Sequence, residues 1–119
     1  MRRLWRAVIN SWNGLVATTR SEEAFRQELL LLAIAVPLAF WITSDIGKRY
    51  MLIGSVILVM VVELLNTAIE KLGDRITREQ DEAIGRVKDM GSAAVGVSLL
   101  FAAAVWVWIA SDYVWSQWP

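Results

Sequence analysis

Three long stretches of this chain carry almost no charge, and they constrain the fold more than any other feature. They cover residues 29–44, 50–62 and 93–111. A bilayer core of about 30 Å needs about 20 helical residues at 1.5 Å each. The third stretch is long enough to span the bilayer by itself, whereas the first reaches spanning length only together with residues 24–28. In water, three such helices would leave large apolar faces uncovered. The pattern therefore predicts an all-α membrane protein, folded as one domain over residues 1–119.

The expected helices have the following bounds. We expect membrane spans at about 24–46, 50–72 and 90–113, with a charged loop over 74–89. Pro37 should kink the first span mildly, residues 43–49 form a polar turn, and Gly85 is an expected hinge before the third span.

Residues 1–20 differ from the three spans because their apolar side chains lie on one helical face only. Arg2, Arg3 and Arg6 lie on the other face, and Trp5 and Trp12 are on the apolar one. Such a basic amphipathic helix is typical of a segment lying flat on an anionic membrane, although the same face would also pack on the protein's own helices. Gly14 and the threonines at 18 and 19 should loosen the chain before Ser21, the expected N-cap of the next helix.

The distribution of lysine and arginine predicts the orientation in the membrane. Five precede the first span, five lie between the second and third, two lie in the other connection and none follows the third span. Positive residues favour the cytoplasmic side. We therefore expect the N-terminus and the charged loop in the cytoplasm and the C-terminus outside.

Missing residue types narrow the chemistry. The chain has no cysteine and no histidine, so thiolate chemistry and histidine-bound metals are excluded. Acid–base work is left to carboxylates, lysine or water. The net charge of zero argues against a nucleic-acid partner.

The second apolar stretch reaches spanning length only if Glu63 and Asn66 lie inside the membrane. With Glu70 and Asp74 they fall within an arc of about 80° on one helix face. A carboxylate at membrane depth costs about 2.5–3.5 kcal/mol, so it is usually functional or paired.

This face suits a reaction between a lipid and a water-soluble reagent. Glu63, the deepest carboxylate, would accept the proton of a lipid hydroxyl, while Glu70, about 10 Å nearer the cytoplasm, would hold Mg²⁺ on nucleotide phosphates. Glu22 lies at the same level as a second metal carboxylate, and Lys88 would neutralise phosphate charge. Asn66 would orient either substrate. Ordinary explanations compete, since Glu22 is also a typical helix-capping charge, and Asp74, Lys88 and Asp89 are typical solvated charges. By pattern alone, a small proton-coupled transporter is as good an interpretation as a lipid-directed kinase.

Three sequence blocks resemble the prokaryotic diacylglycerol kinase family of small trimeric membrane kinases. They are 63–70 (ELLNTAIE) with Asp74 and Arg75 following, 85–95 (GRVKDMGSAAV) and 22–28 (EEAFRQE). The similarity covers nearly the whole chain, and the first two blocks are specific to this family. Asn10, Val87 and Pro37 depart from the family pattern. The resemblance implies a homotrimer in the inner membrane of a bacterium, with active sites shared between subunits.

The resemblance also implies roles for individual residues. Glu63 would be the catalytic base, and Glu22 and Glu70 would be the metal carboxylates. The expected ATP-side residues are Arg3, Asn10, Glu22, Glu70, Lys88 and Asp89. The expected lipid-side residues are Arg3, Trp12, Glu28, Glu63 and Ser92, with Gln27, Asn66 and Asp74 in support. The implied reaction is in-line transfer from Mg-ATP to diacylglycerol, giving phosphatidic acid. Undecaprenol kinase, the same scaffold acting on a polyprenyl alcohol, is the alternative.

Overall fold

The computed structural model describes residues 1–119 and consists of four α-helices without any strand. They are α1 (Arg2–Ser21), α2 (Glu23–Ile42), α3 (Ile46–Ile76) and α4 (Glu82–Gln117). The last three are long and apolar enough to cross a membrane, and α1 is strongly amphipathic. The predicted fold class, one amphipathic helix followed by three spanning helices, is confirmed.

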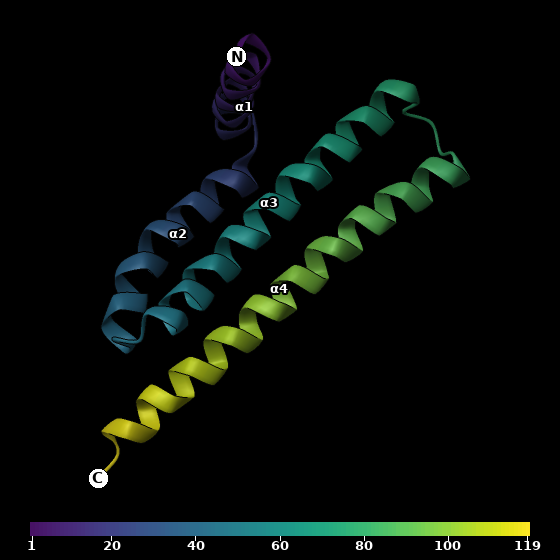
Figure 1. Ribbon diagram of the computed structural model, residues 1–119. Coiled ribbons are helices and arrows are strands. Elements are labelled where there is room, and N and C mark those ends of the chain that lie inside the picture. Colours follow the sequence, from purple (N-terminus) through teal and green to yellow (C-terminus); the bar gives the residue numbers. More distant parts are fainter.

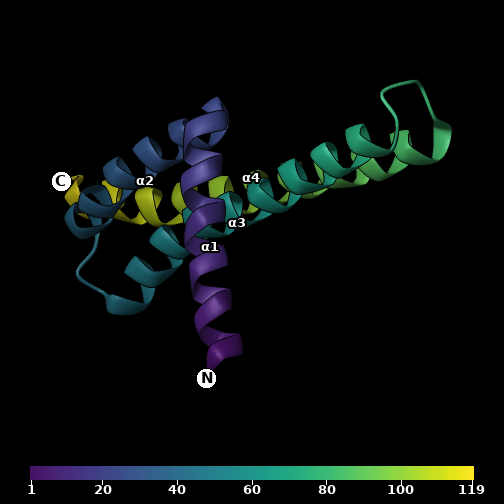
Figure 2. The ribbon, with the colours of Figure 1, turned by 90° about the horizontal axis from the view of Figure 1, so that it is seen from above.

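The three spanning helices form an antiparallel bundle with α3 in the middle, packed extensively on α4 and less on α2 (Figure 1). Seen from above, α1 runs across the bundle instead of along it (Figure 2). A small core of Ala39, Leu52, Val105 and Ile109 lies near the α2–α3 connection. There, Trp106 donates a hydrogen bond of 3.1 Å to the carbonyl of Leu52.

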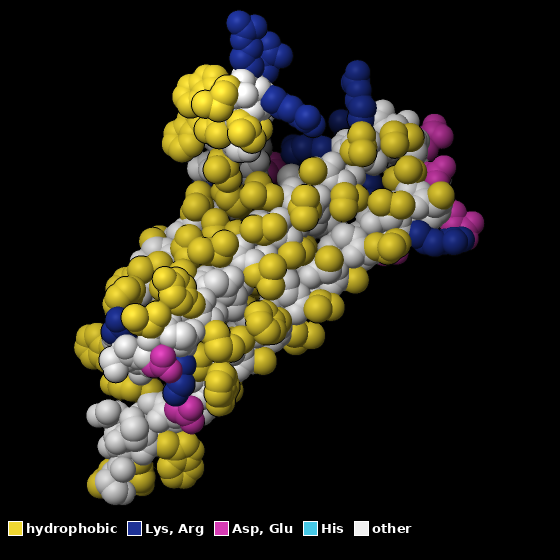
Figure 3. Space-filling model, in the orientation of Figure 1, with side chains coloured by type: hydrophobic (Ala, Val, Ile, Leu, Met, Phe, Trp, Pro, Cys, Tyr) yellow, Lys and Arg dark blue, Asp and Glu magenta, His cyan; other side chains and the backbone are white.

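Most of the chain's apolar surface remains uncovered. Only 15 of 119 residues are buried, and Leu30, Leu100 and Trp108 are among the large apolar side chains left exposed. On the face shown in Figure 3, apolar side chains cover the middle of the bundle and charged ones gather toward its two ends. A single copy in water could not keep so much apolar surface exposed, whereas lipid or further copies would cover it.

Helix α1 and its junction with α2 differ from the expectation. The helix continues through Gly14 and both threonines, and the hydroxyls of Thr18 and Thr19 donate back to the carbonyls of Gly14 and Leu15 at 2.8 and 2.7 Å. These bonds satisfy the hydroxyls within the helix. Ser21 is therefore the last residue of α1 and not a cap, and the extended residue between the two helices is Glu22.

The charged segment 74–89 is mostly helical, which corrects the expected loop. The connection between α3 and α4 comprises only residues 77–81, and Gly85 lies inside α4 instead of forming a hinge. Asp81 explains the early start of α4, since its carboxylate accepts a 3.0 Å hydrogen bond from the backbone N–H of Ile84. A similar cap by Asp45 starts α3 at Ile46, so the predicted turn at 43–49 is also shorter, and α2 continues through Pro37 to Ile42.

Candidate active site

Two half-buried carboxylates lie in the membrane-spanning part of the bundle, one on α2 and one on α3. Glu63 on α3 and Glu28 on α2 are both half-buried, and they lie close enough for their charges to interact. One oxygen of Glu28, Oε1, is fully buried and has no hydrogen-bond partner. Buried polar atoms normally have a partner, so this unsatisfied acceptor marks a place that suits a donor from a bound molecule.

Asn66 and Glu70 continue along the face of α3 that carries Glu63. Asn66 is almost fully buried, and its Nδ2 donates to Glu70 Oε1 over 3.3 Å. Its own carbonyl oxygen, Oδ1, is buried without a partner. Glu63 interacts electrostatically with Glu70 and with Glu22. The predicted face is therefore present, and Glu22 from the start of α2 lies near it.

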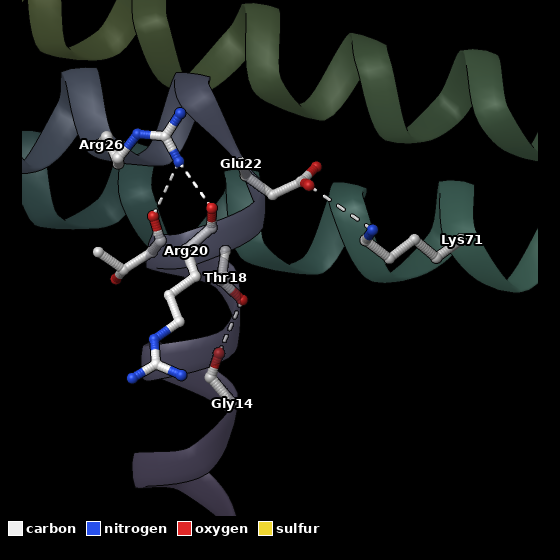
Figure 4. Close-up of polar contacts among 7 residues, drawn as sticks. Gly14, Thr18, Arg20, Glu22, Arg26 and Lys71 are labelled. Atoms are coloured by element: carbon white, nitrogen blue, oxygen red, sulfur yellow. Dashed lines mark hydrogen bonds and ion pairs between the residues drawn. The ribbon is translucent and has the colours of Figure 1, made fainter.

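Glu22 has a partner that the sequence reasoning missed. Its Oε2 lies 3.6 Å from Nζ of Lys71, the residue directly after Glu70, and Figure 4 shows the two side chains reaching toward each other. The same view shows Arg26 closing the α1–α2 junction: its Nη1 donates to the carbonyls of Thr19 and Arg20 at 3.0 and 2.9 Å. Neither contact was predictable, because both depend on how separate helices meet.

Asp74 and Lys88 form the tightest ion pair of the molecule, with 2.6 Å between Asp74 Oδ1 and Lys88 Nζ. Helix α3 has 31 residues and is about 46 Å long, which exceeds the hydrocarbon core of about 30 Å. Asp74 lies two residues from the end of α3, so we place it outside the membrane. There the hydrogen bond from Lys88, and secondarily its charge, lower the pKa of the Asp74 carboxyl. The ion pair thus links Lys88 on α4 to Asp74 on α3.

Other predicted site residues are not brought to this cluster by the single chain. Arg3, Asn10 and Trp12 lie on α1, whose few contacts are with the start of α2, and all three are exposed. Gln27, Asp89 and Ser92 are exposed as well, but they adjoin Glu28, Lys88 and Gly91 in the chain and therefore lie at the edge of the cluster. The structure therefore assembles the carboxylate half of the predicted site and leaves the α1 residues apart from it.

The donor atoms fit magnesium only in part. No three carboxylates lie close enough together to hold a metal ion by themselves. Magnesium, however, usually takes one or two carboxylates and fills its other positions with phosphate and water. Glu22 and Glu70 provide that number of carboxylates, and the contact of Glu22 with Lys71, the residue after Glu70, brings the start of α2 to this part of α3. Their chemistry fits a metal held jointly with nucleotide phosphates.

Comparison with known proteins identifies the family. Residues 9–110 match the family model described as prokaryotic diacylglycerol kinase. This chain belongs to that family. The diacylglycerol kinase of Escherichia coli K12 is 48% identical over 104 residues, which are 87% of this chain and 85% of the relative. Those of Haemophilus influenzae and Pseudomonas aeruginosa are 43% and 38% identical, over 81% and 92% of this chain and 81% and 89% of the relatives.

Family membership decides between the two interpretations that the pattern left open. The chain is an enzyme of a lipid kinase family and not a proton-coupled transporter. A kinase uses ATP as its co-substrate. Three apolar helices and bacterial relatives make it a multi-pass bacterial membrane protein. The predicted resemblance and enzyme class are confirmed.

Proposed function

We propose that this chain transfers the γ-phosphoryl group of ATP to diacylglycerol, producing phosphatidic acid and ADP. One observation carries the proposal: Glu63 is half-buried within an apolar span, while Glu70 follows it by two turns on α3 toward the α3–α4 connection, and Glu22 contacts Lys71 beside Glu70. This arrangement gives a lipid hydroxyl a proton acceptor at membrane depth and leaves the nucleotide side to the other carboxylates. The names of the relatives support diacylglycerol as the lipid.

In the proposed reaction, the oxygen of the lipid hydroxyl attacks the γ-phosphorus of ATP while Glu63 accepts the hydroxyl proton. The new O–P bond forms in line with the breaking bond, and ADP leaves without a phosphoenzyme. The unsatisfied oxygen of Glu28 offers an acceptor for the single hydroxyl of diacylglycerol, because the other two backbone groups of that lipid are esters, which donate no hydrogen bond. Positioning supplies much of the rate, as expected for phosphoryl transfer.

On the nucleotide side, Glu22 and Glu70 would hold magnesium with the phosphates, and the metal would neutralise charge that develops during transfer. Occupation of that site requires Glu22 to exchange its partner Lys71 for the metal. Lys88, held by Asp74, adds a fixed positive charge, and Asp89 follows it on α4.

We also propose that the active site is shared within a homotrimer. The exposed apolar faces and the distance of α1 from the carboxylates support this, because a neighbouring copy would supply Arg3, Asn10 and Trp12. Closed symmetric oligomers are the usual assemblies of small chains. The N-terminus and the α3–α4 connection would face the cytoplasm, where ATP is present, and the C-terminus would face the periplasm.

The deciding experiment uses purified protein in mixed micelles with magnesium and radiolabelled ATP. Diacylglycerol is expected to become labelled phosphatidic acid, and micelles without added lipid provide the blank. Undecaprenol is offered in a parallel reaction. Preferential labelling of undecaprenol would replace diacylglycerol by the polyprenyl alcohol as substrate. Labelling of neither lipid by folded protein would overturn the proposed function.

A further inference from the structure

Helix α4 approaches α3 closely where Gly91 lies against Asn66. Gly91 is buried, and a methyl group built at its Cβ position would overlap Oδ1 of Asn66. The next nearest atoms are Asn66 Cγ at 3.3 Å and Ile69 Cδ1 at 3.8 Å. The space that a side chain at residue 91 would occupy is therefore filled by the carboxamide of Asn66.

This contact determines where the rest of the carboxamide points. Oδ1 of Asn66 is buried and accepts no hydrogen bond from an N–H or O–H group. It lies beside Gly91, where the Cα–H group can make only a weak Cα–H···O contact with it. With the oxygen held on that side, Nδ2 is directed to Glu70 Oε1 at 3.3 Å. The chain of contacts runs from a glycine on α4, through an amide on α3, to a carboxylate one helical turn away.

We propose that Gly91 is a positioning residue for Glu70, acting through Asn66. A side chain at residue 91 would displace the carboxamide, and Glu70 would lose the hydrogen bond that orients its carboxylate. Residues that orient metal ligands in this way typically affect metal affinity or activity about 10–100-fold. The inference rests on the proposed role of Glu70 in holding metal with the nucleotide.

Helix α4 supplies a matched control in Gly96. No atom lies within 4 Å of a Cβ built at Gly96, so Gly96→Ala makes the same chemical change without displacing a neighbour. Both substitutions replace glycine within the same helix, so they alter helix propensity to the same degree. Any difference between Gly91→Ala and Gly96→Ala then reports the contact with Asn66.

The test measures Mn²⁺ binding by electron paramagnetic resonance in the full-length protein with a non-hydrolysable ATP analogue. Gly91→Ala is expected to weaken Mn²⁺ binding about tenfold or more, and Gly96→Ala to bind as the wild type does. Magnesium dependence of the kinase reaction should shift in parallel, with little change in the KM for lipid. Unfolding midpoints in detergent are recorded alongside, since a purely structural role would lower the midpoint of Gly91→Ala without altering Mn²⁺ binding by the folded protein.

A double variant makes the inference independent of that one substitution. Asn66→Ala removes the group that the new methyl would strike, and it should weaken Mn²⁺ binding by itself. Adding Gly91→Ala to Asn66→Ala should cause no further loss, because the contact is already gone. Three outcomes would overturn the inference. Gly91→Ala and Gly96→Ala could bind Mn²⁺ with equal affinity, the double variant could show the sum of the two single losses, or the wild type could bind no Mn²⁺. Failure of the wild type to phosphorylate lipid would instead overturn the proposed function, whereas the Mn²⁺ titrations would still decide the role of Gly91.

Discussion

At the scale of single residues, Glu63 and Glu28 differ from the other carboxylates of the three spanning helices because both are half-buried. Helix α3 carries Glu63, and α2 carries Glu28. Surface glutamates such as Glu23, in the first turn of α2, share their chemistry but not their surroundings. The proposed base can therefore be tested by making the same Glu→Gln substitution at Glu63 and at Glu23 and comparing the two variants.

We expect Glu63→Gln to fold but to lose about 10²–10⁴-fold in turnover, because the amide keeps the shape and cannot accept the hydroxyl proton. Phosphatidic acid formation from radiolabelled ATP measures the loss. Glu23→Gln is the control and should retain wild-type turnover. Retention of more than a tenth of the activity by Glu63→Gln would refute its role as the base.

The proposed metal carboxylates are expected to behave differently from the proposed base. Glu22→Gln and Glu70→Gln should raise the magnesium concentration needed for half-maximal activity more than they raise the KM for diacylglycerol, because each removes a metal ligand. Titration with magnesium at saturating lipid, and with lipid at saturating magnesium, separates the two effects. Magnesium curves that match the wild type for both variants would exclude this pair as ligands.

At the scale of helices, the junction between α1 and α2 is held mainly by Arg26. Its guanidinium donates to two carbonyls at the end of α1, and Glu22 N–H adds a 2.8 Å bond to the carbonyl of Thr18. A cation at a helix C-terminus also interacts favourably with the helix dipole. We infer from these contacts that Arg26 fixes the angle between α1 and α2.

We expect Arg26→Leu to loosen α1 without unfolding α2, α3 or α4. The absence of cysteine allows a single spin label to be attached through Asn13→Cys on the exposed side of α1. The label should become more mobile in Arg26→Leu, and lipid kinase activity should fall with it. Arg20→Leu is the matched control, since only the backbone carbonyl of Arg20 takes part in the junction. If the label is equally mobile in Arg26→Leu and Arg20→Leu, the Arg26 side chain does not hold α1 in place.

The sequence predicted the helices well and their ends less well. Hydrophobic length locates a membrane span, and the face shared by Glu63, Asn66 and Glu70 follows from the periodicity of one segment. Helix ends depend on local details, such as the cap by Asp81 that turns an expected loop into the start of α4. High charge density was mistaken for a loop, although charged residues are good helix formers.

The candidate site was predictable only where it lies within one helix. The pairing of Glu22 with Lys71 and the approach of Gly91 to Asn66 depend on the register between neighbouring helices. No single segment contains that information. The separation of Arg3 from the carboxylates also appears only in three dimensions.

At the scale of the whole molecule, the single chain is too thin to enclose two substrates. It measures 60 × 40 × 23 Å, and its α1 residues lie away from the carboxylate cluster. Under the proposed trimer, Glu63 and Arg3 reach one site from different copies. Two inactive variants with defects on opposite sides of that boundary would then complement each other.

We expect Glu63→Gln and Arg3→Leu, mixed and allowed to exchange subunits, to recover phosphatidic acid formation, because some trimers contain one intact site. Crosslinking through cysteines introduced into the cysteine-free chain verifies exchange. A mixture of Glu63→Gln with Glu70→Gln is the control and should not exceed the residual activity of its parents, because both side chains reach the site from the same α3. Verified exchange without recovery in the first mixture would mean that each site lies within one chain.

The length of α4 has a consequence for how a charged nucleotide meets an anionic membrane. Its 36 residues extend about 54 Å, roughly 24 Å more than a hydrocarbon core. Lys88 and Asp89 lie within its first turns, on a continuous helix and not on a loop. The repulsion that lipid headgroups exert on ATP fades over a Debye length of about 8 Å at physiological ionic strength. The start of α4 at Glu82 lies about 12 Å before the expected span at residue 90 and reaches beyond this layer, whereas Lys88 and Asp89 lie within it, close to the membrane. Because this part of the chain is already helical, binding a nucleotide there costs little conformational entropy.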